Sequence, residues 1–398
     1  MSLPLVPWPG AASRRSPHQA DAHRASGPRD GRNGQTGRRA AGPRGRPRSA
    51  AICCSVATAL SLVAGSGLAA AAAAPRANRA ATAPALHVTI GYENAPDPEM
   101  VAIARNYFSR YMHAQVTMKY YSSGPAALAS LASGSLQFMT VLGNPPLAIA
   151  IAHKVPLQVV WAQEQYTTAE GLVVRRSRHI TKLSQLAGHR VAVAVGSTSS
   201  FELATAEQQK GVSASSVRIE NMSPPAMVAA WKRGALNAAY VWVPFFSQML
   251  QDGGQALLYD QTQGAKAPVF NLAVVNTGFA RTHAAAVVGF VRAEAAGVAF
   301  FQQHPNQAYA EIAHVGGLTV AQARSQAKGL RFVTLAGQLG PGGLGQPGHT
   351  ASALVGQSLQ EAAAWLKASG RVSTIPSNMA AFVNPAYVED VLHAKAPA

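Results

Sequence analysis

The stretch Asn221–Pro244 constrains the fold more than any other part of this 398-residue chain, and it reads N-M-S-P-P-A-M-V-A-A-W-K-R-G-A-L-N-A-A-Y-V-W-V-P. Ser223 is suited to cap a helix, and the two prolines after it stand where a missing N–H costs nothing. The pattern predicts a helix over Ala226–Arg233, ended by Gly234, and a strand over Ala238–Val243. A helix that leads through one glycine into a strand is typical of an α/β sheet.

Strands and helices alternate along the rest of the chain after a long N-terminal segment. A strand over Leu86–Tyr92 is followed by a helix over Glu99–Met112. Further along, a strand over Arg190–Val195 leads into a helix over Phe201–Lys210, and Ala284–His304 predicts one long helix. This alternation predicts a mostly parallel sheet with helices on both faces. The roughly 320 residues involved are enough for two lobes with separate cores.

Residues 1–76 predict a basic leader and signal peptide that is disordered or removed. They hold eleven arginines against two acids, and Ser49–Ala74 is apolar, rich in small residues and ends in alanines. This order of segments is that of a secretory signal, with either a start codon further downstream or a twin-arginine leader at Arg38-Arg39. A nucleic-acid-binding tail before a membrane anchor is the disfavoured alternative, because Ser and Gly interrupt the apolar run. We therefore expect a periplasmic protein.

The charge and the cysteines of the chain exclude several classes of function. Without residues 1–76 the net charge falls from +17 to +8, and the remaining 23 basic residues are scattered, so we expect no nucleic-acid partner. Cys53 and Cys54, the two cysteines of the chain, both lie in the leader. The rest of the chain therefore has no thiol nucleophile and no cysteine metal ligand. We predict no catalytic residue, no metal site and no cofactor.

Small polar residues stand at four junctions where a predicted strand gives way to a helix. The junctions are Glu93–Pro96, Ser122–Pro125, Gly143–Pro146 and Gly196–Ser200. In open parallel sheets a ligand binds beyond the carboxyl ends of the strands, where helix N–H groups receive an oxyanion without any formal positive charge. Helix caps use the same residue types, so one junction alone indicates little. Four junctions facing one cleft predict an anion-binding site.

The signature in Asn221–Pro244 closely resembles that of taurine and aliphatic-sulfonate periplasmic binding proteins, the solute-binding subunits of ABC importers. Other matching stretches are V-T-I-G-Y (88–92), S-G-P-A-A-L-A-S-L-A-S-G (123–134), L-G-N-P-P-L-A (142–148) and S-T-S-S-F (197–201). The resemblance implies an α/β fold of the type II periplasmic binding protein kind. Its two α/β lobes, with mostly parallel sheets, would be joined by two crossover strands near Gly171–Val174 and Asn271–Val275. Lobe I would comprise residues 84–172 and 276–398, and lobe II residues 173–275.

The resemblance also implies a ligand and a role. The ligand would be a small sulfonate such as taurine, bound between the lobes of a monomer and delivered to an ABC permease with its ATPase subunit. Thr198 and Ser199 would hold the sulfonate oxygens, and Trp242 would cover the short alkyl part. The ligand contacts carried over by motif position are Glu93, Asn94, Ser123, Asn144, Thr198, Ser199, Asn237 and Trp242.

Two asparagines stand where the family commonly has an acid, Asn237 and Asn271. A buried carboxylate is the natural partner for the ammonium group of taurine. Either Glu93 or Glu164 replaces the missing acid, or the ligand is an amine-free alkyl or aryl sulfonate or another small oxyanion. A periplasmic sensory module is a further alternative. The same fold hosts a desulfinase-type enzyme and a pyrimidine synthase, but both need a cysteine, so we expect no enzyme.

Overall fold

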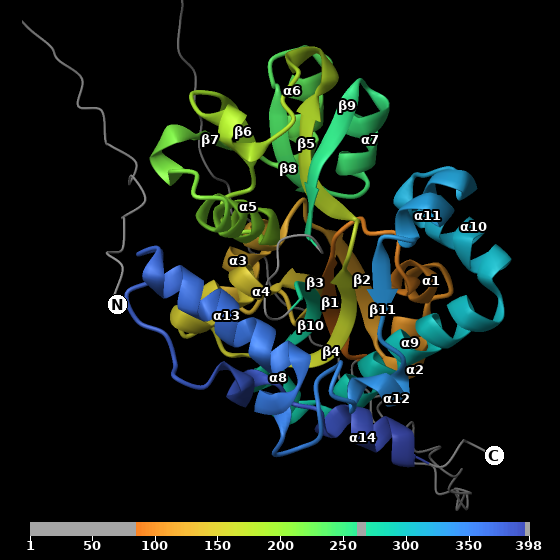
Figure 1. The fold of residues 1–398 in the computed structure, drawn as a ribbon. Helices are drawn as coiled ribbons and strands as arrows, with labels where there is room; N and C mark the ends of the chain where they lie inside the picture. Colours follow the sequence, from red (N-terminus) through yellow and green to blue (C-terminus); the bar gives the residue numbers. More distant parts are fainter. Residues whose placement is uncertain (1–84, 261–267, 395–398) are drawn as a thin grey trace, which may run out of the picture. The chain divides into compact units, whose positions relative to one another are not determined.

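The computed structural model describes residues 85–260 and 268–394, and the predicted leader and signal peptide over residues 1–76 lie outside this part. Strands and helices alternate through the described ranges, and the strands form two separate sheets (Figure 1). The alternation predicted from the sequence is therefore confirmed, including the helix and strand of the Asn221–Pro244 stretch.

The first sheet has six strands, and most of them point the same way. Strands β1 to β4 run in one direction, whereas β10 and β11 run against them. β10 lies in the middle, between β3 and β4, and pairs antiparallel with both. The strand order is β11 (Leu330–Phe332), β4 (Leu157–Tyr166), β10 (Phe270–Asn276), β3 (Phe138–Gly143), β1 (His87–Tyr92) and β2 (Gln115–Tyr120).

The second sheet has five strands. Strands β6 to β9 run in one direction and β5 runs against them. The order is β7 (Arg218–Asn221), β6 (Arg190–Val193), β8 (Ala238–Trp242), β5 (Glu170–Arg175) and β9 (Gly254–Tyr259). The chain enters this sheet between β4 and β5 and leaves it between β9 and β10. The boundaries predicted for the two lobes stay a prediction.

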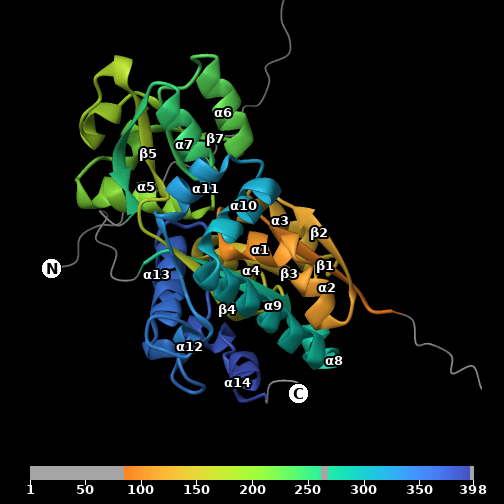
Figure 2. The same cartoon turned by 90° about the vertical axis from the view of Figure 1, so that its right-hand side faces the viewer.

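Helices cover the sheets. α1, α2 and α9 lie together beside the first sheet (Figures 1 and 2), where the rings of Phe138 and Phe290 stack at 4.4 Å between centroids. The helices in chain order before the second sheet are α1 (Pro98–Ala104), α2 (Tyr107–Met112), α3 (Gly124–Ala132) and α4 (Asn144–Ala152). Those that accompany the second sheet are α5 (Thr198–Gln209), α6 (Pro224–Lys232) and α7 (Phe245–Gln251). The later ones are α8 (Thr277–Thr282), α9 (Ala284–Gln303), α10 (Pro305–Gly316), α11 (Val320–Ala327), α12 (Leu335–Gln338), α13 (Leu354–Ala368) and α14 (Ala386–His393).

The apolar pattern of β8 explains how the second sheet acquires a core on each face. Side chains alternate between the two faces of a strand. Tyr240 accordingly joins one hydrophobic cluster, whereas Val241 joins the cluster on the other face, around the fully buried Trp231 of α6. The strand is thus buried on both faces, as expected for the centre of a mostly parallel sheet.

The predicted helix over Glu99–Met112 is divided in the structure. α1 ends at Ala104, and α2 begins only at Tyr107. Asn106 between them has a left-handed backbone, with φ of 54°, which an α-helix does not tolerate in its interior. Asparagine is among the residues that adopt this conformation most readily, so the prediction of one continuous helix was wrong at a residue suited to the break.

α9 is long and apolar enough to cross a membrane by composition alone, with a mean hydropathy of 1.6 in its most apolar window. Half of that window is buried inside the protein, against α1 and α2 among others. Its apolar character is explained by this position in the core.

The contact between α9 and α2 yields a prediction about stability. A Cβ atom at Gly289 would meet the carbonyl oxygen of Tyr111 and would lie 2.7 Å from the Cα of Met112. Both are backbone atoms and cannot rotate away, so we expect Gly289→Ala to lower the free energy of unfolding by about 1–3 kcal/mol. Gly342→Ala is the matched control, since a Cβ there meets nothing within 4 Å. Urea unfolding of both variants checks this, and equal effects would contradict the packing argument.

Candidate functional site

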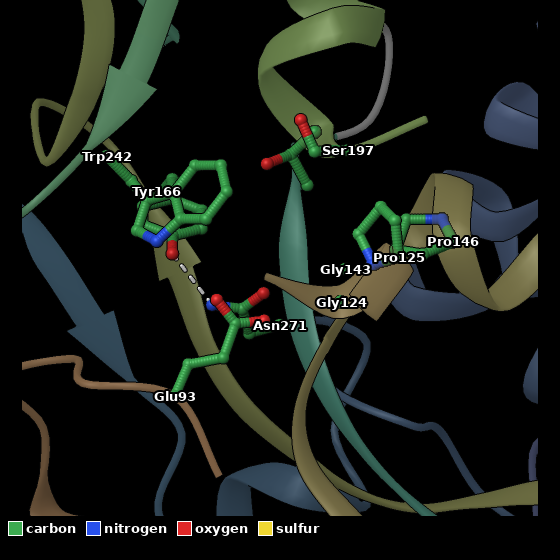
Figure 3. A pocket seen from close by; sticks show the side chains of 10 residues that line it. Glu93, Gly124, Pro125, Gly143, Pro146, Tyr166, Ser197, Trp242 and Asn271 are labelled. Carbon is green, nitrogen blue, oxygen red and sulfur yellow. Dashed lines mark hydrogen bonds between the residues drawn. The ribbon is translucent and has the colours of Figure 1, made fainter. Parts of the chain in front are cut away.

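A pocket lies where strands of both sheets end (Figure 3). In this structure the pocket is small: the volume that the centre of a water molecule can reach is about 10 Å³, which holds about one water. A ligand of several non-hydrogen atoms can therefore enter only if the walls move apart. The residues that line the pocket are Glu93, Gly124, Pro125, Gly143, Pro146, Tyr166, Ser197, Thr198, Trp242 and Asn271.

Three helices begin at this pocket, but they differ in what they offer an anion. The first N–H groups of a helix have no partner inside the helix and attract negative charge. α4 begins with the sequence N-P-P and α3 with G-P. Proline has no backbone N–H, so the first turn of each of these helices has fewer hydrogen-bond donors for an anion. α5 begins at Thr198 after the N-cap Ser197 and has no proline in its first turn. The start of α5 is therefore the strongest oxyanion receptor in the pocket.

The side-chain hydroxyl groups at the start of α5 both donate hydrogen bonds to one buried carboxyl group. Thr198 Oγ1 donates a hydrogen bond of 2.8 Å to Glu170 Oε1, and Ser199 Oγ donates to the same oxygen. A hydroxyl has one proton, so these two side chains have lone pairs but no proton left for a ligand. The backbone N–H groups of α5 are what remains to hold an oxyanion, in place of the hydroxyls named from the sequence.

Glu170 belongs to a network of buried side chains in the second sheet. Its carboxyl group lies close to that of Asp260, whose Oδ1 accepts a hydrogen bond of 2.9 Å from the Tyr240 hydroxyl. Burial raises the pKa of Asp260 well above its ordinary value, and the negative charge of Glu170 raises it further. The pair of Glu170 and Asp260 therefore retains a proton more readily than exposed carboxyl groups do.

Glu93 follows β1 and points into the pocket, with 6% of its surface exposed (Figure 3). Burial raises the pKa of Glu93 well above its ordinary value, and the nearby charge of Glu170 adds to this. A ligand cation would reverse the effect, because an opposite charge at close range favours the ionised carboxylate. Glu93 is thus well suited to receive a positively charged group.

Asn271 and Tyr166 form the floor of the pocket. Asn271 Nδ2 donates to the Tyr166 hydroxyl oxygen at 2.8 Å, shown as the dashed line in Figure 3, and to Glu164 Oε1 at 2.7 Å. Tyr166 and Trp242 belong to one hydrophobic cluster beside these polar atoms. The floor combines two aromatic rings with an amide and a phenol hydroxyl.

Glu164 lies behind Asn271, fully buried, and does not line the pocket. Its carboxyl group lies close to that of the buried Asp97, just before α1. Burial raises the pKa of Glu164 well above its ordinary value and that of Asp97 to about 7. The first sheet therefore has a carboxyl pair behind the pocket, as the second sheet does.

The structure brings three of the predicted ligand contacts to the pocket wall, Glu93, Thr198 and Trp242. Ser123 is the N-cap of α3, directly before the lining residue Gly124, and Ser199 is buried behind Thr198. These five positions lie at or next to the pocket, although their roles as ligand contacts stay predictions.

Three other predicted contacts point elsewhere. Asn94 Nδ2 donates to the carbonyl of Gly316 in α10 at 2.9 Å. Asn144 donates to Ser358 and accepts from the backbone N–H of Phe270 at 2.8 Å, so its amide ties α4 to α13 and β10. Asn237 precedes β8 at its amino end, five residues from Trp242, and accepts a hydrogen bond from Arg178 Nε. A strand rises about 3.3 Å per residue, so Asn237 lies on the order of 16 Å from the pocket end.

Tyr166 is the lining residue that the sequence analysis missed. It is the last residue of β4. Alternation along the strand puts Glu164 and Tyr166 on the same face, and this period of two was the available signal. Ser197 and Asn271 were noticed in the sequence but were not assigned to the site.

Comparisons with known proteins identify the family and the fold of the chain. A family model described as NMT1/THI5 like matches residues 97–308. The taurine-binding periplasmic protein of Escherichia coli (strain K12) is 28% identical over 316 residues, which are 77% of this chain and 94% of that protein.

Two solved structures align over most of the chain. The alkanesulfonate-binding protein SsuA from Xanthomonas axonopodis pv. citri bound to MOPS has a TM-score of 0.63 and 19% identity, over 76% of this chain and 99% of that one. The desulfurization enzyme DSZB has a TM-score of 0.57 and 14% identity, over 77% and 98%. The predicted fold class is thereby confirmed.

The buried Asp97 yields a prediction about pH. Its pKa is about 7 in the folded protein, against an ordinary value of 3.8, so the folded state retains a proton that the unfolded chain releases. The stability that this proton contributes is complete below about pH 4 and is lost as the pH rises through about 7. We expect Asp97→Asn to flatten the dependence of the unfolding free energy on pH across this window. Urea unfolding from about pH 4 to pH 8 measures it, with the exposed Asp390→Asn as control, and a slope like that of the wild type would contradict it.

Proposed function

Because the chain belongs to the NMT1/THI5-like family, matched over residues 97–308, we propose that it is the solute-binding component of an ABC importer. It binds taurine or a closely related small sulfonate in the pocket between the two sheets. The observation that carries this proposal is the pairing of an oxyanion receptor with a carboxylate in one small pocket: the start of α5 and Glu93.

The two ends of taurine carry opposite charges, and the pocket offers a partner for each. The N–H groups at the start of α5 suit the sulfonate oxygens, because the helix dipole adds to their hydrogen bonds. Glu93 suits the ammonium group, and the rings of Tyr166 and Trp242 line the same space. A cation beside an aromatic ring is attracted by its negative face. An amine-free sulfonate would leave Glu93 buried without a counter-charge.

The relatives support the same ligand class. The E. coli relative is named as a taurine-binding periplasmic protein, and the Xanthomonas structure is an alkanesulfonate-binding protein bound to MOPS. The acid missing at Asn237 is no obstacle to taurine, since that residue is at the far end of β8 from the pocket. Glu93 is the carboxylate that replaces it.

The proposed role includes a location and partners. A periplasmic position, a membrane permease and its ATPase subunit follow from the importer role, and the chain acts as a monomer. The two sheets support a division into lobe I, residues 84–172 and 276–398, and lobe II, residues 173–275. Movement of one lobe against the other would open the pocket and release the ligand.

Catalysis is the alternative that the structural likeness to the desulfurization enzyme raises. Among the described residues, the ten that line the pocket include no cysteine and no histidine. The hydroxyl of Thr198 donates to Glu170, and burial raises the pKa of Glu170, so its ionised form is disfavoured. This is a poor environment for a hydroxyl nucleophile, so binding without reaction is the proposed function.

Isothermal titration of the purified protein against taurine, ethanesulfonate and sulfate tests this function. We expect taurine to bind most tightly. Glu93→Gln should lower the affinity for taurine by about tenfold to a hundredfold, because a charged hydrogen bond is worth about 1.5–3 kcal/mol. The affinity for ethanesulfonate should change much less. Asp390→Asn, an exposed acid on α14, is the control for loss of one charge.

The outcomes separate the parts of the proposal. Absence of binding to all three compounds would reject sulfonate binding. Tighter binding of ethanesulfonate than of taurine would keep a sulfonate site and reject the ammonium partner at Glu93. Equal losses for both sulfonates in Glu93→Gln would reject the same partner.

The contact of Gly143 with Thr198 yields a second prediction. A Cβ at Gly143 would lie 2.6 Å from Thr198 Cγ2, across the pocket between β3 and α5. We expect Gly143→Ala to hold these elements apart and to lower the affinity for taurine by about tenfold. This corresponds to the free-energy cost of adding a methyl group to a tightly packed contact. Thr198→Ser removes that methyl group and keeps the hydroxyl that donates to Glu170. The double variant should therefore recover affinity, and a double variant as weak as Gly143→Ala would contradict this account.

A further inference from the structure

Asn271 has no side-chain N–H left for a ligand. Its amide nitrogen carries two hydrogens, and the two acceptors are Glu164 Oε1 at 2.7 Å and the Tyr166 hydroxyl oxygen at 2.8 Å. The adjacent antiparallel strands place the three side chains together, since Asn271 and Glu164 are direct partners across β10 and β4. Asn271 therefore offers the pocket only its carbonyl oxygen Oδ1.

Glu164 prevents the opposite orientation of this amide. If the Asn271 amide turned over, its carbonyl oxygen would face Glu164 Oε1 at hydrogen-bond distance, and both atoms are acceptors. Glu164 is 0% exposed and Asn271 is 4% exposed, so water cannot readily relieve that contact. The orientation of the amide is thus determined from behind the pocket wall.

The Tyr166 hydroxyl is the next group in the chain of hydrogen bonds. Its oxygen accepts from Asn271, so its own proton points away from Asn271. Burial raises the pKa of Tyr166 well above its ordinary value, and the charges of Glu164, Glu170 and Glu93 raise it further. The hydroxyl keeps its proton and, because Tyr166 lines the pocket, can donate it to an oxygen of the ligand.

We infer that Glu164 is a positioning residue which, through Asn271, fixes the Tyr166 hydroxyl as a hydrogen-bond donor to the ligand. The inference depends on the proposed function for the identity of the ligand alone. It separates the two ends of a bound zwitterion: Tyr166 donates to an oxyanion, and Asn271 Oδ1 accepts from an amine. Glu164, first considered a ligand contact, acts without touching the ligand.

Asp97 completes the arrangement behind Glu164. The two buried carboxyl groups lie close together, and a hydrogen bond between them requires a proton on one of them. Whichever of the two carries the proton, Glu164 Oε1 remains an acceptor for Asn271. A neutral glutamine at this position could make both bonds.

The first test is made on the ligand-free full-length protein. Nuclear magnetic resonance with isotope-labelled asparagine measures how fast the Nδ2 hydrogens of Asn271 exchange with solvent. We expect slow exchange in the wild type and in Glu164→Gln, and exchange at least about tenfold faster in Glu164→Leu, where one acceptor is lost. Equal exchange in the wild type and a folded Glu164→Leu would overturn the inference.

The second test is a double-mutant cycle on taurine affinity. Tyr166→Phe removes the hydroxyl, and we expect it to weaken binding about tenfold in the wild type and in Glu164→Gln. In Glu164→Leu, where the amide is free to turn, the same change should cost little. An equal cost of Tyr166→Phe in all three backgrounds would overturn the positioning role of Glu164.

The tests remain decisive if one variant or the proposed ligand fails. Should Glu164→Leu not fold, Asn271→Leu replaces it in the double-mutant cycle, because it removes the amide between Glu164 and Tyr166. Tyr166→Phe should then also cost little taurine affinity in the Asn271→Leu background. Should no sulfonate bind to the wild type, the proposed function fails, and amide exchange still decides the inference. Slow exchange in Glu164→Gln together with fast exchange in Glu164→Leu would show that the hydrogen bond to Asn271, and not a general loss of stability, controls the exchange rate. Thermal unfolding of both variants measures their stability in parallel.

Discussion

The antiparallel pairing of β10 with β3 and β4 is the contact on which the site depends. β10 returns from the second sheet and enters the middle of the first, so its first residues lie where the two sheets meet. Phe270 is held there by the Asn144 amide, and Asn271 by Glu164. Because these anchors are buried, a shift of β10 by one residue would turn Asn271 away from the pocket and break both bonds.

The buried acids around the pocket follow a common physical pattern. Asp97 and Glu164 lie behind the first-sheet side, and Glu170 and Asp260 behind the second. The ion pairs Arg105–Glu311 and Arg190–Glu220, by contrast, lie at the partly exposed surface. A carboxyl pair that shares a proton carries at most one negative charge and still presents oxygen acceptors. Such pairs orient hydroxyl and amide groups without adding the full repulsion that two carboxylates would impose on an anion.

Much of the fold follows from the sequence because its signals are local. The Ser-Pro-Pro start, Gly234 and the apolar run after it are enough to define α6 and β8 within two residues. The division of α1 from α2 could not be read in the same way, since the apolar pattern continues through Asn106 and only its backbone conformation breaks the helix.

The site was predictable as a region but less so residue by residue. The rule that ligands bind at the carboxyl ends of strands favours Glu93 and Trp242, which line the pocket. Applied strictly, it disfavours Asn237, which precedes its strand. The rule cannot distinguish Asn144 from its neighbour Gly143. Asn144 faces α13 and β10, and that orientation depends on partners more than a hundred residues away.

The two sides of the pocket differ in how they restrict a ligand, and this difference favours a zwitterion. On the α5 side the hydroxyl protons are committed to Glu170, so an oxyanion meets backbone donors whose positions are fixed by the helix. On the β10 side the amide protons are committed to Glu164 and Tyr166, so an amine meets the carbonyl oxygen of Asn271 and the carboxylate of Glu93. The Tyr166 hydroxyl keeps its own proton and can donate it to an oxygen of the ligand. A Cβ at Gly143 would lie 2.6 Å from Thr198 Cγ2, so the two sides are close together in this structure and must separate to admit a ligand. A molecule that carries both a sulfonate and an ammonium group satisfies the donors and the acceptors together.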